Sequence, residues 1–370
     1  MFPHSRPEDL LERFENNVPN DQNYVQGLIW GNGDADTCNY PTKIGNAWPV
    51  GDSRGYFGHN FYRNTRLWRK KGWDSMEVVR KYAARRNWEF QVYIRMQAFT
   101  APFPFDRLIH SDFFHRHPQY HCLDRRGQRI GRLSYAYPAV QEHMLKLIAE
   151  ILNYKPDGIC LCLIRGVPLV FYEPLMVAGF KKEYGVAPQH LAETDGRWQA
   201  YQATIITAFI RQAKRLLKPR QRLSVIVPGL PYDCARWGLD VAAWVKEGLV
   251  DDVFPFGQYF DKRSEVHRFD VRSLDFKYFN ALANRDQIRL IPMAALGSAS
   301  KLRRMRLYLK QGADGYAAWD GVAGDQHITV NTIARNSGKT IKPASVKQNK
   351  VNLLSLGGFR HDRYHHFEVT

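Results

Sequence analysis

The stretch Pro156–Gly166, with the sequence PDGICLCLIRG, decides the fold class of this chain. Its centre, Gly158–Ile164, is a short apolar run without charge, which predicts a buried strand. Apolar residues recur at helical spacing before it, over Pro138–Tyr154, and a second helix is predicted after it, over Glu173–Tyr184. A buried strand between two helices is the repeating unit of a parallel sheet that carries helices on its outside.

The same alternation continues in both directions along the chain. Strands are predicted at Tyr24–Trp30, Glu89–Met96, Gly158–Ile164, Leu223–Val227, Val253–Phe256, Ile288–Met293 and Gly315–Trp319. Helices are predicted at Pro7–Asn17, Asp74–Arg86, Pro138–Tyr154, Glu173–Tyr184, Trp198–Leu217, Tyr232–Glu247, Leu274–Asn284, Ala299–Gln311 and Gln326–Asn336. A long loop is predicted between Gln97 and Ala136.

This alternation predicts the α/β class and, within it, a (β/α)8 TIM-type barrel. The pattern holds seven strands and begins with a helix, Pro7–Asn17, so we expect the barrel to lack its first strand at the N-terminus. Either the start of the chain is incomplete or the barrel is open. An open doubly wound sheet is the alternative, but no Gly-x-Gly-x-x-Gly turn follows a strand. We expect residues 1–335 to form one domain and residues 336–370 a C-terminal extension on or near it.

Composition narrows the class of protein. The chain has 370 residues, 44% of them hydrophobic and 24% charged, which is typical of a globular protein. No apolar stretch is long enough for a membrane span, so a membrane partner is not expected. The first residues hold no apolar signal core, so the chain as written is expected to be cytoplasmic, unless its start is incomplete.

The five cysteines favour a reduced compartment. Their number is odd, and Cys160 and Cys162 lie two apart in one predicted strand, where their side chains share a face. A disulfide framework is therefore not expected. No Cys-x-x-Cys or His-Glu-x-x-His spacing occurs, so neither a metal nor another cofactor is expected.

The formal net charge of +17 allows three interpretations. It favours an anionic glycan as substrate, a solvated basic surface, or a nucleic-acid partner. The basic residues are spread over the chain, with local runs at Arg66–Lys71, Arg211–Arg222 and Lys301–Arg306. Nucleic-acid binding needs a cluster on one face, so nucleic acid is not expected as a partner, while the other two interpretations stay open.

The residues that follow predicted strands give the candidate site, because active sites of such barrels lie at the carboxyl ends of the strands. They combine carboxylates, arginines and aromatic rings, which suits cleavage of glycosidic bonds by a pair of carboxylates. The candidate catalytic residues are Glu173, Asp320 and Asp34. The candidate substrate-binding residues are Trp30, Asn32, Asp36, Arg95, Arg165, Tyr172, Tyr259, Asp261 and Trp319.

Glu173 is predicted to be the general acid. Its neighbours Phe171, Tyr172 and Pro174 are apolar, and an apolar setting raises the pKa of a carboxyl group. Asp320 is predicted as its partner, with Asp34 and Asp36 in reserve. For each of them the structural alternative is a helix cap or a loop hydrogen bond.

Other chemistries have weaker support in the sequence. No Gly-x-Ser-x-Gly turn is present, so a serine hydrolase is not expected. Cys162 is predicted to be an inert thiol within a buried strand. The histidines of the long loop, His110, His115, His117 and His121, have irregular spacing, which does not favour a metal site.

Several motifs together resemble one family. They are the strand entry Tyr154–Gly158 (YKPDG) with Pro156–Gly166, Tyr172–Pro174 (YEP), Phe180–Gly185 (FKKEYG), Asp195–Trp198 (DGRW), His117–Tyr120 (HPQY), Gly31–Asp34 (GNGD) and Ala318–Asp320 (AWD). Over about Pro7 to Asp320 the chain resembles the glycosyl-hydrolase-like (β/α)8 barrel proteins, also called family 10-like. The resemblance implies a barrel that acts on carbohydrate, and makes the first predicted strand here the family's second.

The chain departs from that family in one respect. Many relatives carry acids in the strand where this chain has Cys160 and Cys162. If those acids are catalytic, this chain retains Glu173 outside the strand, or it binds glycans without cleaving them.

The sequence therefore predicts a glycoside hydrolase, on an anionic polysaccharide or oligosaccharide. Its alternatives are a non-catalytic glycan-binding barrel and a metal-assisted sugar isomerase or lyase on the same fold. The expected partner is a carbohydrate, with a second chain if the barrel edge is open.

Overall fold

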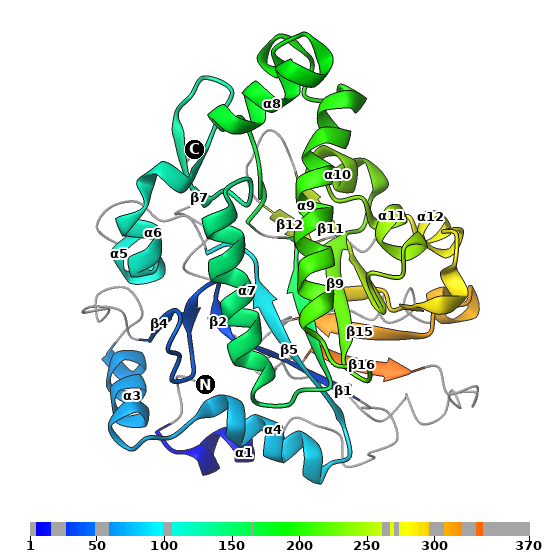
Figure 1. Cartoon of the computed structure of the whole chain (residues 1–370). Coiled ribbons are helices and arrows are strands. Elements are labelled where there is room, and N and C mark those ends of the chain that lie inside the picture. Colours follow the sequence, from blue (N-terminus) through cyan, green and yellow to red (C-terminus); the bar gives the residue numbers. More distant parts are fainter. Residues whose placement is uncertain are drawn as a thin grey trace.

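A computed structural model describes residues 5–15, 27–48, 59–98, 106–164, 166–260, 267–269, 274–295, 307–319 and 331–335 (Figure 1). The α-helices are α1 (Pro7–Glu15), α3 (His59–Lys70), α4 (Ser75–Arg85), α5 (Asp106–Ile109), α6 (Asp112–Arg116), α7 (Pro138–Leu152), α8 (Pro174–Tyr184), α9 (Gly196–Leu216), α10 (Pro231–Arg236), α11 (Val241–Lys246) and α12 (Phe276–Asn280). The longer strands are β1 (Gly27–Gly31), β5 (Glu89–Arg95), β7 (Arg129–Leu133), β8 (Gly158–Cys162), β9 (Arg222–Pro228), β10 (Asp252–Phe256), β15 (Gly315–Trp319) and β16 (Asn331–Arg335). The shorter ones are β2 (Gly33–Asp34), β3 (Thr37–Cys38), β4 (Asn46–Ala47), β6 (His121–Leu123), β11 (Gln258–Phe260), β12 (His267–Phe269), β13 (Arg289–Leu290) and β14 (Met293–Ala295).

The main sheet is an α/β barrel. From β1 the parallel pairings run to β5, β8, β9 and β10, then to β13 and β14, and on from β14 to β15. The pairings of β16 with β15 and with β1 are antiparallel, and they complete the ring. The predicted fold class is therefore confirmed. Each of the seven predicted strands is present, with Ile288–Met293 divided between β13 and β14.

Strand β16 corrects two expectations. A helix was predicted over Gln326–Asn336, but Asn331–Arg335 forms a strand. This strand occupies the place between β15 and β1 that was expected to be empty, so the gap is filled by a later part of the chain in antiparallel direction. The pairing satisfies the backbone N–H and C=O groups along the facing edges of β1 and β15. The open barrel edge, which was the condition for a second chain as partner, is thus occupied by β16.

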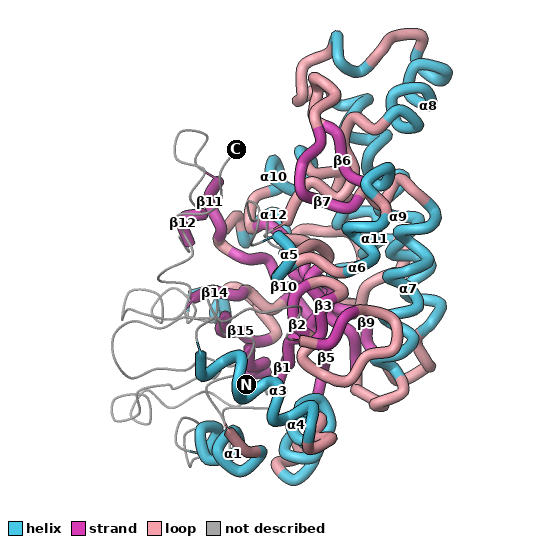
Figure 2. Tube along the Cα trace, turned by 90° about the vertical axis from the view of Figure 1, so that its left-hand side faces the viewer, coloured by secondary structure: helices cyan, strands magenta, loops and turns pink. Residues whose placement is uncertain are grey.

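Two apolar layers lie on opposite sides of the strands. The inner layer fills the barrel and consists of Ile29, Tyr93, Cys160, Cys162, Ile164, Ile226, Phe254, Phe256, Ile291, Met293 and Ala317. The outer layer lies between the strands and helices such as α4, α7 and α9, with Val79, Leu147 and Phe209 among its buried residues (Figures 1 and 2). Cys160 and Cys162 share the inner face, as their spacing predicted.

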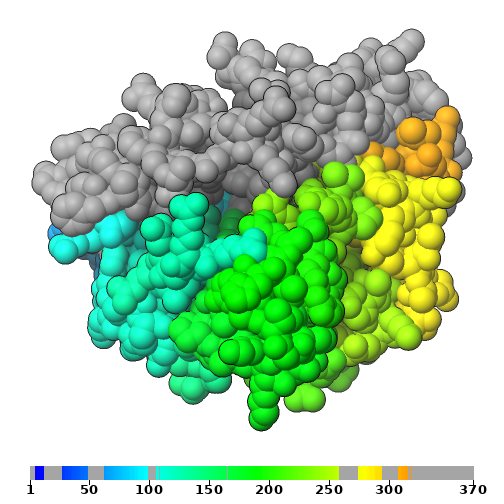
Figure 3. All heavy atoms as spheres, turned by 90° about the horizontal axis from the view of Figure 1, so that it is seen from above, coloured from blue at the N-terminus to red at the C-terminus, as the bar shows by residue number. Residues whose placement is uncertain are grey.

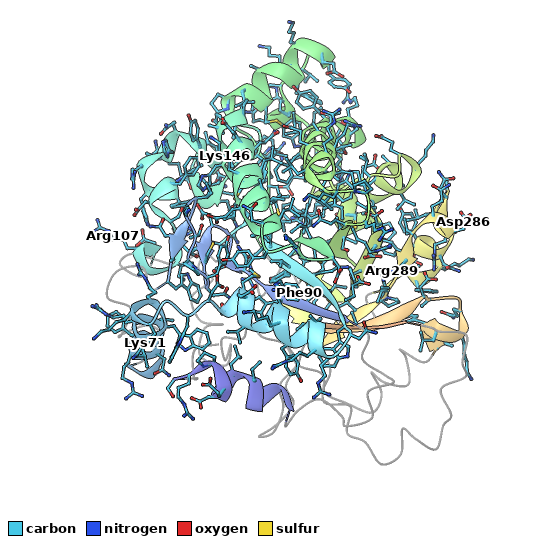
Figure 4. The ribbon with its side chains drawn as sticks, turned by 60° about the horizontal axis from the view of Figure 1, so that its bottom comes forward. Lys71, Phe90, Arg107, Lys146, Asp286 and Arg289 are labelled. Atoms are coloured by element: carbon cyan, nitrogen blue, oxygen red, sulfur yellow. The ribbon has the colours of Figure 1, made fainter. Side chains whose placement is uncertain are left out.

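A polar network closes the amino-terminal end of the barrel. Asp252 on β10 is fully buried and accepts hydrogen bonds from Arg222, Ser224, Arg289 and, at 3.0 Å, the amide of Gln91. Burial alone would raise the pKa of Asp252, but the arginine side chains outweigh burial and lower it to about 2. The network lies on the lower side of the molecule, where Arg289 is labelled in Figure 4. Polar groups at this end of such a barrel contribute to stability rather than catalysis.

The described segments between Gln97 and Ala136 and between Gly166 and Tyr184, named here the excursion, lie above the opposite end of the barrel. The long loop predicted between Gln97 and Ala136 in fact contains α5, α6 and the β6–β7 hairpin. The hairpin and α8 lie side by side above the strands (Figures 2 and 3). None of the described helices is both long and apolar enough to cross a lipid bilayer.

Candidate functional site

A buried pair of opposite charges lies at the carboxyl ends of two neighbouring strands. Arg95 is the last residue of β5, and Asp34 lies three residues beyond the end of β1, its parallel neighbour. Nη1 of Arg95 is 3.4 Å from Oδ1 of Asp34, and both side chains are more than nine-tenths buried. A buried arginine beside a carboxylate offsets part of the cost of burying both charges. The structure therefore brings together two of the predicted site residues.

Tyr93 is a third member of this buried group and contacts Arg95. It precedes Arg95 by two residues, so both side chains point into the barrel, and Nε of Arg95 donates a hydrogen bond to the hydroxyl of Tyr93 at 3.2 Å. Burial would lower the pKa of Arg95, but its neighbours Tyr93 and Asp34 raise it, and the guanidinium stays charged. The sequence analysis missed Tyr93, although its spacing of two from a strand-end arginine was a usable signal.

A small sheet of β2, β3 and β4 positions Asp34. In this sheet Asp34 pairs with Thr37, and Gly33 pairs with Cys38. Gly33 has a φ of 133°, and a Cβ at this residue would lie 2.2 Å from the carbonyl oxygen of Thr37, so only glycine fits. The amide of Asn32 donates to the carbonyl oxygen of Ala35 at 2.8 Å and stabilises the same turn.

Asp36 serves a different contact. Its Oδ2 is 2.8 Å from Nε2 of His143 on α7, and both side chains are buried. The ring of Phe113 stacks on His143 with centroids 3.9 Å apart. Asp36 therefore ties the small sheet to α7, and this contact supports the structural alternative for Asp36 over a role in binding substrate.

Two predicted aromatic subsite residues are enclosed. Trp30 is fully buried and belongs to the outer layer, between the strands and the helices. Tyr172, in the excursion, is 3% exposed. Its ring stacks on that of Trp198 in α9, with centroids 5.2 Å apart. Neither ring offers a free face to a sugar, so the prediction that they line sugar subsites is not supported.

Glu173 lies in the excursion as well. It precedes the first residue of α8 and has no exposed surface. Its carboxylate accepts hydrogen bonds from the backbone N–H of Phe171, at 2.9 Å, and of Leu123, at 3.3 Å. Burial raises the pKa of Glu173, in the direction that its apolar neighbours predicted. The contacts themselves support an anchor between α8 and the β6–β7 hairpin.

The remaining predicted residues are described in part or not at all. Asp320, Arg165 and Asp261 lie outside the described residues. For Tyr259 in β11 and Trp319 in β15 the structure describes the strand but not the side chain. Residues 336–370, predicted to be an extension, also lie outside the described part.

Asp233 is a carboxyl group that the sequence analysis missed. It lies in α10, which follows β9 after a short turn, and it is 7% exposed. Burial raises the pKa of Asp233, and the nearby Arg236 only partly opposes this shift. A buried carboxyl with a raised pKa beyond the carboxyl end of a barrel strand is a candidate general acid.

The cysteines and histidines show no metal chemistry in the described part of the chain. Each of the five cysteines is a buried free thiol. The rings of His110 and Phe114 stack with centroids 3.8 Å apart, and burial lowers the pKa of His110 to about 3. Within the described ranges, no three His, Cys, Asp or Glu residues are grouped to hold a metal ion.

Comparisons with known proteins add a likeness of fold. No family model matches the chain, and no curated protein does. The glycoside hydrolase domain of PelA from Pseudomonas aeruginosa shares 14% identity, covering 68% of this chain and 87% of that one, with a TM-score of 0.40. The C-terminal domain of a putative chitinase from Desulfitobacterium hafniense DCB-2 shares 12%, covering 80% and 67%, with a TM-score of 0.38. The maltogenic α-amylase AmyB from Thermotoga neapolitana shares 12%, covering 88% and 67%, with a TM-score of 0.42. These three structures share little sequence identity with this chain, and at these TM-scores the likeness assigns no activity.

Proposed function

We propose that this protein is a glycoside hydrolase in which Asp34 is the ionised carboxylate of the catalytic pair. The observation that carries the proposal is the buried Asp34–Arg95 contact at the carboxyl ends of β1 and β5. Active sites of (β/α)8 barrels lie at this end. An ionised carboxylate there can act as nucleophile or general base, or stabilise the positive charge that develops on the sugar ring.

The topology of the barrel suggests where a second carboxylate can stand. On β16, Ile333 pairs with Ala317 of β15 and Asn331 pairs with Ile29 of β1, so β15 ends about two residues below the end of β1. One strand separates them, which places their backbones roughly 10 Å apart. Asp320 follows the last residue of β15 in the sequence.

We therefore assign the general acid to Asp320 in this proposal. Glycosidase carboxylates stand roughly 5 to 10 Å apart, which suits two carboxylates on strands at this spacing. Asp233 is the second candidate for the acid, because its pKa is raised. Glu173 is not part of the proposed pair, because both of its oxygens accept backbone hydrogen bonds.

One observation favours a second function, glycan binding without cleavage. The inner face of β8 carries the thiols of Cys160 and Cys162, packed among apolar side chains. Many members of the family that the sequence resembles carry acids in this strand. A barrel that lost those acids could keep a sugar site without turnover.

The experiment is a hydrolysis assay on neutral and anionic polysaccharides, read as new reducing ends, with the wild type and single Asp-to-Asn variants. We expect Asp34→Asn to lower kcat about a thousandfold or more, and one of Asp320→Asn and Asp233→Asn to do the same. Asp240→Asn, at the exposed N-cap of α11, is the matched control and should keep full activity. Folding of each variant is checked by its melting temperature.

The outcomes separate the two functions. Turnover by the wild type that disappears in Asp34→Asn supports the hydrolase. Turnover that is unchanged in Asp34→Asn contradicts the assignment of Asp34. Saturable binding of a polysaccharide with no turnover by the wild type supports the glycan-binding barrel.

A further inference from the structure

Helix α3 carries a stripe of exposed positive charge. Arg63, Arg66 and Lys70, named here the basic stripe, lie at spacings of three and four residues, so they share one helix face, and all three are exposed. The opposite face is buried through Asn64 and Trp68. The sequence of α3, HNFYRNTRLWRK, contains no acidic residue, and Lys71 directly follows it at the edge of the molecule (Figure 4).

Arg66, the middle residue of the stripe, is positioned by a contact that does not neutralise its charge. Nη1 of Arg66 donates a hydrogen bond to the hydroxyl of Tyr62 at 2.7 Å, and its guanidinium lies over that ring. Among the described residues, no carboxylate forms an ion pair with a residue of the stripe. Some basic side chains elsewhere are paired, as in Arg211 with Glu247 at 2.6 Å. The stripe is therefore a source of positive potential that no carboxylate of the described residues cancels through an ion pair.

The stripe lies beside the sheet that carries Asp34. Nη1 of Arg69, on α3, contacts the carbonyl oxygen of Ala47 at the end of β4. Strand β4 pairs with β3, which pairs with β2 and so with Asp34. Two strand spacings separate β4 from β2, which is a distance of about 10 Å. Figure 1 shows α3 next to β4, at the side of the barrel where β2 lies.

We propose that the basic stripe of α3 binds acid groups of an anionic polysaccharide whose chain extends from the Asp34 site past β4 to α3. This inference rests on the proposed function and adds its substrate class. The three residues span seven positions of helix, about 10 Å at 1.5 Å per residue. Such widely spaced charges match a glycan with one acid group per sugar or disaccharide.

Duplex DNA is a poorer match for the same stripe. It carries one charge per roughly 1.7 Å of helix axis, and its affinity grows with the number of phosphates that are neutralised. Three cations on one short helix neutralise few of them. We therefore treat nucleic-acid binding as an outcome of the test.

The test measures the affinity of the full chain for fluorescently labelled polygalacturonate as a function of salt. Two triple variants are compared. The α3 variant carries Arg63→Glu, Arg66→Glu and Lys70→Glu. The α9 variant, the control, carries Arg215→Glu, Lys218→Glu and Arg220→Glu. The control residues are exposed at and beyond the C-terminal end of α9, and the change in net charge is the same. Melting temperatures show that both variants fold.

We expect the α3 variant to bind at least about tenfold more weakly, with a shallower salt dependence, and the α9 variant to bind within about twofold of the wild type. Equal losses in both variants would overturn the proposal, because net charge alone would then govern binding. Equal affinity for neutral dextran, or tighter binding of a DNA duplex with the same loss in the α3 variant, would also overturn it.

Asp34→Asn separates this inference from the proposed function. It should abolish cleavage, and adding the three α3 substitutions to it should still weaken the binding of polygalacturonate at least about tenfold. If cleavage depends on Asp34 but affinity does not depend on α3, the inference about α3 fails and the hydrolase stands. If affinity depends on α3 but no cleavage is seen with the wild type, the hydrolase fails and the binding surface stands.

Discussion

The guanidinium of Arg95 and the carboxylate of Asp34 lie 3.4 Å apart, and together they join the carboxyl ends of β1 and β5 inside the protein. Removal of one partner of a buried ion pair costs about 3–5 kcal/mol. We expect Arg95→Met to lower the free energy of unfolding by about this amount, as measured by urea denaturation.

A double variant tests whether the cost comes from the charge. Asp34→Asn with Arg95→Met removes both charges and should recover much of the stability lost in Arg95→Met alone. A double variant that loses the sum of the two single losses would show that the two side chains do not interact.

The network at the lower end of the barrel predicts a particular acid sensitivity. The folded-state pKa of Asp252 is lowered to about 2 from an ordinary value of 3.8. A lowered pKa contributes stability that is present above pH 3.8 and is lost as the pH falls through about 2. By linkage this contribution is about 2 kcal/mol. We expect the free energy of unfolding of the wild type to fall steeply over this window.

The variant Asp252→Asn is compared with the wild type over this pH range. It should be less stable at neutral pH by about 3–5 kcal/mol, because Arg222 loses its carboxylate partner and Arg289 keeps only Glu89. Its unfolding free energy should also change less than that of the wild type between pH 4 and 2. An identical slope in both proteins would mean that Asp252 does not titrate in this range.

Glu173→Gln distinguishes an anchor from a general acid. The amide oxygen of glutamine can still accept from Phe171 and Leu123, so we expect kcat within about threefold of the wild type. A loss of about a thousandfold would instead identify Glu173 as the acid.

The pH dependence of Glu173→Gln has a definite sign. Burial raises the pKa of Glu173 above its ordinary 4.5. Its contribution to stability is therefore present below pH 4.5 and is lost as the pH rises through the folded-state value. Because glutamine stays neutral, Glu173→Gln should gain stability relative to the wild type between pH 4.5 and 7, as followed by urea denaturation.

Gly33 offers a test of how the turn positions Asp34. An alanine there meets the carbonyl oxygen of Thr37 at a φ of 133°, so we expect Gly33→Ala to cost about 1–3 kcal/mol and to lower kcat by displacing Asp34. Gly72→Ala is the matched control, since Gly72 also has a positive φ but no atom within 4 Å of an added Cβ. The control should cost about 1 kcal/mol and leave kcat unchanged.

The barrel strands could be predicted because each is a short apolar run between polar turns. The run around Cys160 and Cys162 is an example, and both thiols face the barrel interior as expected. Strand β16 could not be predicted in this way. Asn331–Arg335 is short and without period, and it becomes a strand because the edges of β15 and β1 supply its hydrogen bonds.

The candidate site was predictable only in part, because position after a strand does not fix the direction of a side chain. Asp34 and Arg95 were found by this rule and lie together. Trp30 ends its strand as well, but its side chain faces the helices. Asp233 was missed because it follows β9 by several residues, beyond the turn that opens α10.

The most direct test of the central claim is the distance between the carboxyl groups of Asp34 and Asp320 in a crystal structure. The proposal predicts that both face the upper opening of the barrel with their carboxyl carbons roughly 5–10 Å apart, the shorter separation for a retaining enzyme and the longer for an inverting one. An Asp320 carboxyl that points into the helix layer or into solvent, well beyond this range from Asp34, would contradict the proposed catalytic pair.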